Sequence, residues 1–209
     1  MVARVKTVAF QGIDVLEVDA QVTITSGMVA FTVVGLPDKA VAESRERVRA
    51  ALNALGLALP PRRITVNLAP ADVAKEGSHY DLPIALGLLG AMGVLPVDEI
   101  EGYMALGELA LDGALLPVAG VLPAAMAAAE RELGLICPAA SGGEAAWAGS
   151  IEVLAAQLNH ASAGSGMLGH LAIEMFNILV GVRLQNIPYK GAGPALTDLL
   201  GGQVQLYCR

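Results

Sequence analysis

The sequence lacks an uncharged apolar run long enough to span a lipid bilayer, although 55% of its 209 residues are hydrophobic. Its longest such run, residues 82–97, falls short of the roughly 20 residues that a transmembrane helix needs, and prolines and glycines interrupt it. We interpret this run as a buried core helix with its exit turn, and we expect no membrane partner.

The N-terminus lacks the long apolar segment and the small-residue cleavage site of a secretory signal peptide, so we expect a cytoplasmic protein. Cysteine is scarce as well: Cys137 and Cys208 are the only two, and they lie far apart in the sequence. In a reducing compartment we expect both to be free thiols rather than a disulfide.

Positive charge is also in short supply. Lys and Arg total 13 against 20 Asp and Glu, which gives a net charge of −7 at pH 7. This balance argues against a surface that coats nucleic acid, and it leaves room only for a local basic patch. The phosphate-binding pattern G-x-x-x-x-G-K-[ST] is absent too, so we expect no ATP site in this chain.

Strand and helix patterns do alternate along the chain, up to about residue 156. Three β-branched runs, residues 3–10, 13–22 and 28–34, are predicted to be the strands of a meander. A helix follows, with Asp38 as its N-cap and Gly56 as its C-terminal stop. The alternation predicts one α+β domain with an α/β-like order of elements.

Later elements are predicted in the same way. A strand occupies residues 62–70, and a second helix begins near Asp81. Residues 103–118 are predicted to form a β-hairpin with Asp112 and Gly113 in a two-residue turn. An Ala-rich helix, a short buried strand, a short helix and a last strand complete the domain.

Two stretches of this domain, "VVGLPDKAVAESRERVRAALNALG" and "GYMALGELALDGALLPVAGV", closely resemble the N-terminal domain of the ComM/YifB family. These bacterial AAA+ ATPases are labelled magnesium chelatase-like or competence proteins. The resemblance covers residues 1–156 and implies the fold of the Lon protease catalytic domain, a two-layer βαβ arrangement like that of some ribosomal proteins. It also implies an ATPase module with ATP and Mg²⁺ elsewhere in the full-length family, which acts in DNA branch migration, a helicase activity, during natural transformation.

The resemblance also identifies the positions that carry catalysis in Lon proteases, which use a Ser nucleophile and a Lys base. Their serine motif aligns with "KEGSHYD", residues 75–81. His79 takes the nucleophile position and Leu122 takes the position of the base. Ser78 is offset by one residue, so we expect no catalytic residue and no enzymatic activity in this chain. We interpret the loop as a structural turn, with Asp81 as the N-cap of the next helix.

Two other groups of residues suggest binding sites. The spacing of Asp72, Glu76, His79 and Asp81 matches no established metal site, so we expect neither a metal nor a cofactor here. The arginines form one basic concentration, which consists of Arg45, Arg47, Arg49, Arg62 and Arg63. They are either a salt-bridged, solvated surface or a contact for DNA, for a neighbouring subunit or for the ATPase module.

The last part of the chain resembles a different family. "LNHASAGSGMLGHLAIEMF" and "IPYKGAGPALTDLLGGQVQL" are similar to the Bug family of periplasmic solute-binding proteins, receptors of tripartite tricarboxylate transporters. This implies a short βαβ-type fragment, residues 157–209, in which Ser165 and Gly166 hold a ligand carboxylate at a helix N-terminus. About fifty residues are few for an independent core, so part of this fragment is expected to be disordered.

We therefore expect a non-catalytic Lon-like domain, residues 1–156, that is cut off before its ATPase module and fused to a receptor fragment. Its expected role is structural or regulatory, through docking on the AAA+ module or on homo-oligomeric neighbours. DNA is the other partner considered. The alternative function is a carboxylate-binding module that works through residues 157–209.

Overall fold

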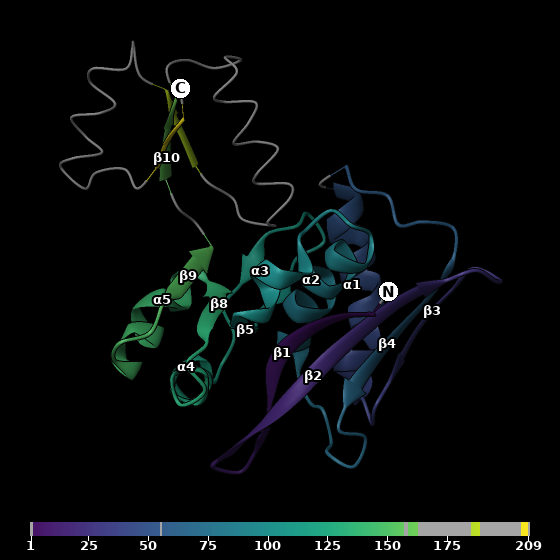
Figure 1. Ribbon diagram of the computed structural model, residues 1–209, viewed down its shortest axis with the longest axis horizontal. Helices are drawn as coiled ribbons and strands as arrows, with labels where there is room; N and C mark the ends of the chain where they lie inside the picture. The colour runs from purple at the N-terminus through teal and green to yellow at the C-terminus, as the bar shows by residue number, and fades with distance from the viewer. Residues whose placement is uncertain (1, 55, 157–158, 163–184, 189–205, 209) are drawn as a thin grey trace. The chain divides into compact units, whose positions relative to one another are not determined.

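The computed structural model describes residues 2–54, 56–156, 159–162, 185–188 and 206–208. The chain forms two compact units, Met1–Ala155 and Ala156–Arg209, and each is described by itself (Figure 1).

A seven-stranded sheet forms the centre of the first unit, in the order β3-β4-β2-β1-β5-β8-β9. Its strands are β1 (Val2–Gln11), β2 (Asp14–Thr25), β3 (Ala30–Val34), β4 (Arg63–Ala69), β5 (Tyr103–Ala105), β8 (Gly134–Pro138) and β9 (Val153–Ala156). Strand β2 runs antiparallel to β1 and β4, whereas the pairs β3–β4, β1–β5 and β5–β8 are parallel. The predicted mixture of helices and strands is confirmed.

The predicted meander is wrong, because β4 lies between β2 and β3. Strand β3 pairs in parallel with β4, from Ala30 beside Arg63 to Val34 beside Asn67. Parallel neighbours need a crossover connection, and the helix α1 (Lys39–Ala54) provides it. A β-branched run predicts a strand correctly, but it does not specify which strand will pair with it.

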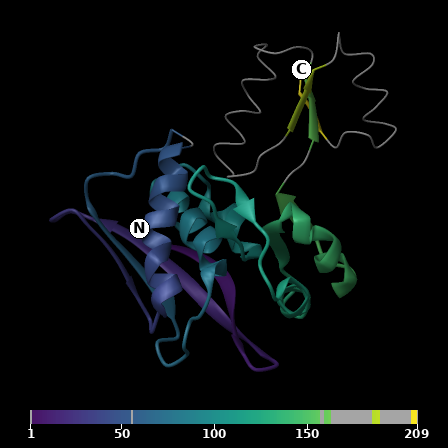
Figure 2. The same cartoon turned by 180° about the vertical axis from the view of Figure 1, so that it is seen from behind.

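Helices cover both faces of the sheet. They are α1, α2 (Asp81–Ala91), α3 (Val97–Glu101), α4 (Val121–Ala129) and α5 (Ala139–Ala145), with single 3₁₀ turns at η1 (Ser78–Tyr80) and η2 (Ala146–Ala148). Helix α2 packs on β1 at Ala3 and Val5, whereas α4 packs against Val8. Because side chains alternate along a strand, these contacts lie on opposite faces. Figure 2 shows α1, in blue, in front of the sheet.

Helix α2 is the buried core helix that the apolar run predicted. Every residue from Asp81 to Gly90 in it is buried. Glycine allows the close approach to the sheet, since a Cβ at Gly87 would lie 2.6 Å from the Val22 side chain. In the described part of the chain, no helix is both long and apolar enough to cross a membrane.

Local signals set the ends of α1. The Val41 N–H donates a hydrogen bond to Asp38 Oδ1 at 2.7 Å, which confirms the predicted N-cap. At the other end Gly56 has a φ of +78°, and the Leu57 N–H donates to the Leu52 carbonyl at 2.8 Å. This is the left-handed stop that a glycine at this position favours.

The predicted hairpin is smaller than expected. Residues 103–105 join the large sheet as β5, and only β6 (Glu108–Leu109) and β7 (Leu115–Leu116) form the hairpin. Its turn has three residues rather than two, because the Ala110 carbonyl accepts from Gly113 while the Ala110 N–H donates to the Ala114 carbonyl. Gly113, at φ +88°, takes the left-handed position of such a loop.

The second unit contains a parallel three-stranded sheet in the order β11-β10-β12. Its strands are β10 (Asn159–Ser162), β11 (Gln185–Pro188) and β12 (Leu206–Cys208). Their parallel pairing agrees with the βαβ-type fragment that the resemblance implies. The helices predicted between them lie outside the described residues, and so do Ser165 and Gly166.

Candidate functional site

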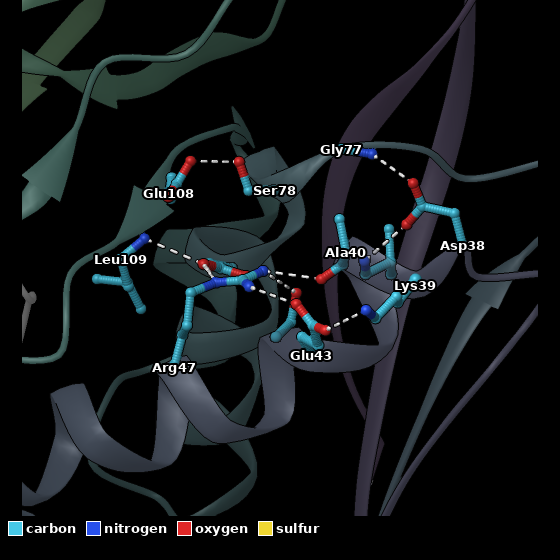
Figure 3. A network of polar contacts seen from close by, with 12 residues as sticks. Asp38, Lys39, Ala40, Glu43, Arg47, Gly77, Ser78, Glu108 and Leu109 are labelled. Carbon is cyan, nitrogen blue, oxygen red and sulfur yellow. Dashed lines mark hydrogen bonds and ion pairs between the residues drawn. The ribbon is translucent and has the colours of Figure 1, made fainter.

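Residues 75–81, which we call the serine loop, lead into α2, and Ser78 in this loop faces a carboxylate. The Ser78 hydroxyl donates a hydrogen bond to Glu108 of β6 (Figure 3). The nearest lysine in sequence, Lys75, is buried and donates its ammonium to the Pro70 carbonyl instead. Among the described residues no lysine is bonded to Ser78. The pairing of hydroxyl and amine that Lon-type chemistry needs is therefore not formed here.

The two positions that align with the Lon dyad hold residues with structural contacts. His79 is only 6% exposed, and its ring nitrogen Nε2 donates to the Val8 carbonyl at 2.8 Å. The ring also packs near Phe10, with 5.4 Å between ring centroids. Burial lowers the pKa of His79, so the imidazole is held neutral. Leu122 lies in the first turn of α4, where its N–H donates to Glu144 at 3.2 Å.

A cleft of about 360 Å³ lies over this loop. It is lined by residues 76–79 and by residues 117–119, which precede Leu122. Phe10 and Glu108 complete its described lining, which contains no lysine and no arginine. The described lining thus combines polar groups of the loop and of Glu108 with the apolar side chains of Phe10 and residues 117–119.

The strongest polar contact of the site joins α1 to α2, and sequence reasoning missed it. Arg47 makes a two-pronged ion pair with Asp81, with Nε 2.6 Å from Oδ2 and Nη2 2.9 Å from Oδ1 (Figure 3). The Asp81 Oδ2 also accepts the N–H of Leu109 on β6 at 3.1 Å. The hydrogen bond that Arg47 donates to Asp81 raises the pKa of Arg47. One buried carboxylate therefore connects three elements.

The prediction that Asp81 is the N-cap of α2 is wrong. Tyr80 takes the N-cap position, Asp81 is already helical, and its fully buried carboxylate points away from the helix backbone toward Arg47. A usable signal was present in the sequence, because a single aspartate at the start of an otherwise apolar helix needs a buried partner. Arg47 lies next to the buried stripe of α1, between Ser44 and Val48.

Two of the four residues considered as metal ligands are bonded to other parts of the fold. Asp81 is paired with Arg47, and His79 is bonded to a backbone carbonyl. Among the residues that the structure describes, no group of three or more His, Cys, Asp or Glu side chains is arranged to hold a metal ion.

The structure divides the predicted arginine surface into two parts. On α1, Glu46 pairs with Arg45 at 3.2 Å and more loosely with Arg49 at 3.6 Å. Arg62 and Arg63 are exposed at the start of β4. Arg49 and Arg62 line a common cleft of about 350 Å³, whereas Arg45 and Arg63 do not line it.

The comparisons with known proteins fit this architecture. Residues 20–141, more than half of the chain, match the family model described as subunit ChlI of Mg-chelatase. The chain belongs to this ChlI family. Its match begins within β2 and ends within α5, so it includes the serine loop, the Arg47–Asp81 pair and the hairpin.

The relatives of this ChlI-family chain confirm its resemblance to the ComM/YifB family. It is 46% identical to the "Uncharacterized protein YifB" of Salmonella typhimurium over 123 residues, 59% of this chain and 24% of that protein. It is 43% identical to the "Competence protein ComM" of Haemophilus influenzae over 137 residues, 66% of this chain and 27% of that protein. The matched part thus spans about a quarter of the length of these relatives.

The second resemblance is confirmed as well. Residues 122–208 match the model of the tripartite tricarboxylate transporter family receptor. The "Protein BugT" of Bordetella pertussis is 51% identical over 39 residues, 19% of this chain and 12% of that protein. The receptor match begins in α4 and overlaps the ChlI match at residues 122–141, so it starts earlier than residue 157.

Proposed function

We propose that the first unit of this chain is a non-catalytic, Lon-like docking domain of a ComM-type AAA+ ATPase. One observation carries the proposal: the serine, the lysine and the histidine of the 75–81 loop are each bonded to another part of the fold. Ser78 is bonded to Glu108, Lys75 to the Pro70 carbonyl and His79 to the Val8 carbonyl. The family membership supports the parent protein that the proposal names.

The chemistry of these partners favours an inert loop. A serine becomes a nucleophile when a base accepts its proton, and a carboxylate such as Glu108 is a much weaker base than a lysine amine. The neutral His79 is no substitute, because its Nε2 proton already goes to a carbonyl and its ring is buried beside Phe10.

The same contacts favour a docking role. Asp81 joins α1, α2 and the hairpin through Arg47 and the Leu109 N–H, and Ser78 adds a second bond to the hairpin at Glu108. Elements held in this way present fixed surfaces to a neighbour, which lowers the entropic cost of association. In this proposal ATP hydrolysis and DNA branch migration belong to the rest of a ComM-type protein in the cytoplasm.

The inert loop is tested with a fluorophosphonate probe, which labels activated serines. We expect no label on Ser78 by mass spectrometry at pH 8, and Ser78→Ala is the matched control. A label on Ser78 in the folded protein that the variant lacks would contradict the proposal.

The docking role is tested in a chimera. Residues 1–155 replace the matching segment of H. influenzae ComM, and sedimentation velocity and ATP hydrolysis are compared with those of intact ComM and of ComM without the segment. We expect the chimera to assemble as intact ComM does and the deletion to lose assembly. A deletion that assembles normally would overturn the docking role.

A second candidate, carboxylate binding by the second unit, has a specific observation in its favour, the receptor match at residues 122–208. The parallel sheet of β10, β11 and β12 agrees with it. Calorimetry against citrate tests this function. Heat of binding that disappears when residues 157–209 are deleted supports it, and no heat from the full chain excludes citrate as the ligand.

A further inference from the structure

Two adjoining hollows lie where the chain passes from α1 to β4. The larger, about 350 Å³, is bounded by the start of β3, by α1 and by residues 58–62. The smaller, about 260 Å³, reaches the ends of β2 and α2. Both are lined by Ala58, Pro60 and Arg62, and together they form a surface that we call the Arg62 groove.

The floor and rim of the Arg62 groove are apolar. Phe31 and Ile64 form part of its floor and are themselves core residues, 7% and 3% exposed. Val29 on the rim is 65% exposed, and the adjacent Met28 is 87% exposed. Exposed apolar side chains beside a hollow are typical of a surface that another chain covers.

The groove also adjoins an open sheet edge. Strand β3 is the terminal strand of the seven-stranded sheet, and only β4 pairs with it in the described part of the chain. Its sequence, AFTVV, contains neither the charges nor the proline by which proteins usually protect an edge. An unprotected edge offers backbone hydrogen bonds to an extended peptide.

Positive charge at the groove is not neutralised by its surroundings. No Asp or Glu is found among the described lining residues of either hollow. Arg49 has a single loose ion pair, 3.6 Å from Glu46, and Arg62 has none among the described residues. This leaves the Arg62 guanidinium without an ion pair among the described residues and Arg49 with a single loose one, and a guanidinium can bind a carboxylate through two parallel hydrogen bonds.

We propose that the Arg62 groove binds an extended segment of a partner protein that carries carboxylates and apolar side chains on the same face, at every second residue. The apolar side chains occupy the hollows, the carboxylates bind Arg49 and Arg62, and the backbone pairs with β3. This inference rests on the docking role proposed above, and it names the surface and the kind of partner.

The groove fits such a peptide better than DNA. DNA binding relies on several phosphate contacts along a strip, and here Arg45 is paired with Glu46 and lies outside the groove. Stacking of bases needs exposed aromatic rings, whereas Phe31 is buried.

The probe is a phage-displayed library of random decapeptides, selected on the immobilised full chain. We expect enrichment of peptides with two or more acidic residues among Val, Ile, Leu or Phe. A selected peptide is then labelled with fluorescein and titrated by anisotropy. Arg49→Glu and Arg62→Glu should each weaken binding about tenfold or more, because a charge-assisted hydrogen bond is replaced by repulsion.

Arg45→Glu is the matched control, because it makes the same charge change on α1 outside the groove, and its affinity should stay within about twofold. A peptide with lysines in place of its acidic residues should regain affinity for the Arg49→Glu/Arg62→Glu protein, which also shows that this variant is folded. The inference is overturned if no acidic peptides are enriched. Equal losses in all three variants overturn it too, as does a 20-base-pair DNA duplex that binds more tightly than any selected peptide.

The chimera separates failure of this inference from failure of the docking role. If the chimera assembles and its Arg49→Glu/Arg62→Glu form does so equally well, the groove is not the docking surface and the docking role stands. If ComM assembles without the matched segment, the docking role fails, whatever the groove binds.

Discussion

The serine loop and the Arg62 groove lie in the same unit, but they differ in whether their polar side chains are bonded within the fold. In the loop, Ser78, His79 and Asp81 are each bonded to another part of the fold. In the groove, Arg49 and Arg62 face solvent with little or no neutralising charge. A polar group that the fold itself binds adds to stability, whereas one left without a partner is available for recognition. The difference can be measured.

The largest effect on stability is expected when Asp81 loses Arg47, its ion-pair partner on α1. Arg47→Ala leaves the fully buried Asp81 carboxylate without its partner, so we expect the free energy of unfolding to fall by about 3–5 kcal/mol. Urea titration followed by circular dichroism measures the change. Arg45→Ala, which removes an exposed arginine from the same helix, is the control and should change stability by less than about 0.5 kcal/mol.

A double variant sharpens this result. In Arg47→Leu/Asp81→Leu both charges of the ion pair are removed, and we expect it to recover a large part of the stability that Arg47→Ala loses. An Arg47→Ala protein as stable as Arg45→Ala would show that the ion pair contributes no more than a surface contact.

The next effect depends on pH. Burial depresses the pKa of His79 below its usual value of 6.5, so the unfolded chain takes up this proton while the folded protein does not. The free energy of unfolding is therefore not reduced by His79 above about pH 6.5. Below that value it falls as the pH drops, by at most about 1.4 kcal/mol per pH unit. Urea titrations at pH 7.5, 6.5 and 5.5 measure the slope. His79→Gln, which keeps a donor for the Val8 carbonyl, should flatten it, and an unchanged slope would refute the assignment to His79.

A smaller loss is expected at the serine itself. Ser78→Ala removes the hydrogen bond to Glu108, and because this carboxylate is half-buried, water can replace part of the contact. We expect a loss of about 1 kcal/mol by urea titration. Ser26→Ala, at an exposed position with no hydrogen bond of its side chain in the described residues, should be neutral by comparison. Equal stabilities of the two variants would mean that the hydrogen bond from Ser78 to Glu108 does not stabilise the fold.

The smallest effect on stability belongs to the groove. Arg62→Ala and Arg63→Ala replace neighbouring exposed arginines, and both should leave the free energy of unfolding within about 0.5 kcal/mol of the parent. Only Arg62→Ala should weaken a selected acidic peptide in the anisotropy titration, because Arg63 does not line the groove. Similar losses of affinity in both would place the contact on the general basic surface.

The sequence predicted the features that depend on neighbours in the chain. Asp38 and Gly56 mark the ends of α1 because a cap and a left-handed stop act within one helical turn. The longest uncharged apolar run likewise identified the buried helix α2. The position of β4 within the sheet was mispredicted, because strand order depends on pairings between distant segments.

The candidate site shows the same limit. The sequence placed Ser78 outside the catalytic register, but it did not reveal Glu108 as the partner of Ser78 or Arg47 as the partner of Asp81. Both contacts join segments that are far apart in the chain, and they form only after α1, α2 and the hairpin have packed together. A lone carboxylate in an apolar helix indicates that a partner exists without identifying it.

The insertion of β4 between β2 and β3 has a consequence during translation. The β1–β2 hairpin can close as soon as both strands have left the ribosome, whereas β3 must wait until Arg63–Ala69 is made. At the usual speed of synthesis this wait lasts roughly 2–7 s. Phe31 and Val33 lack their β4 neighbours on the nascent chain for that time, so a chaperone can bind this segment before the sheet closes.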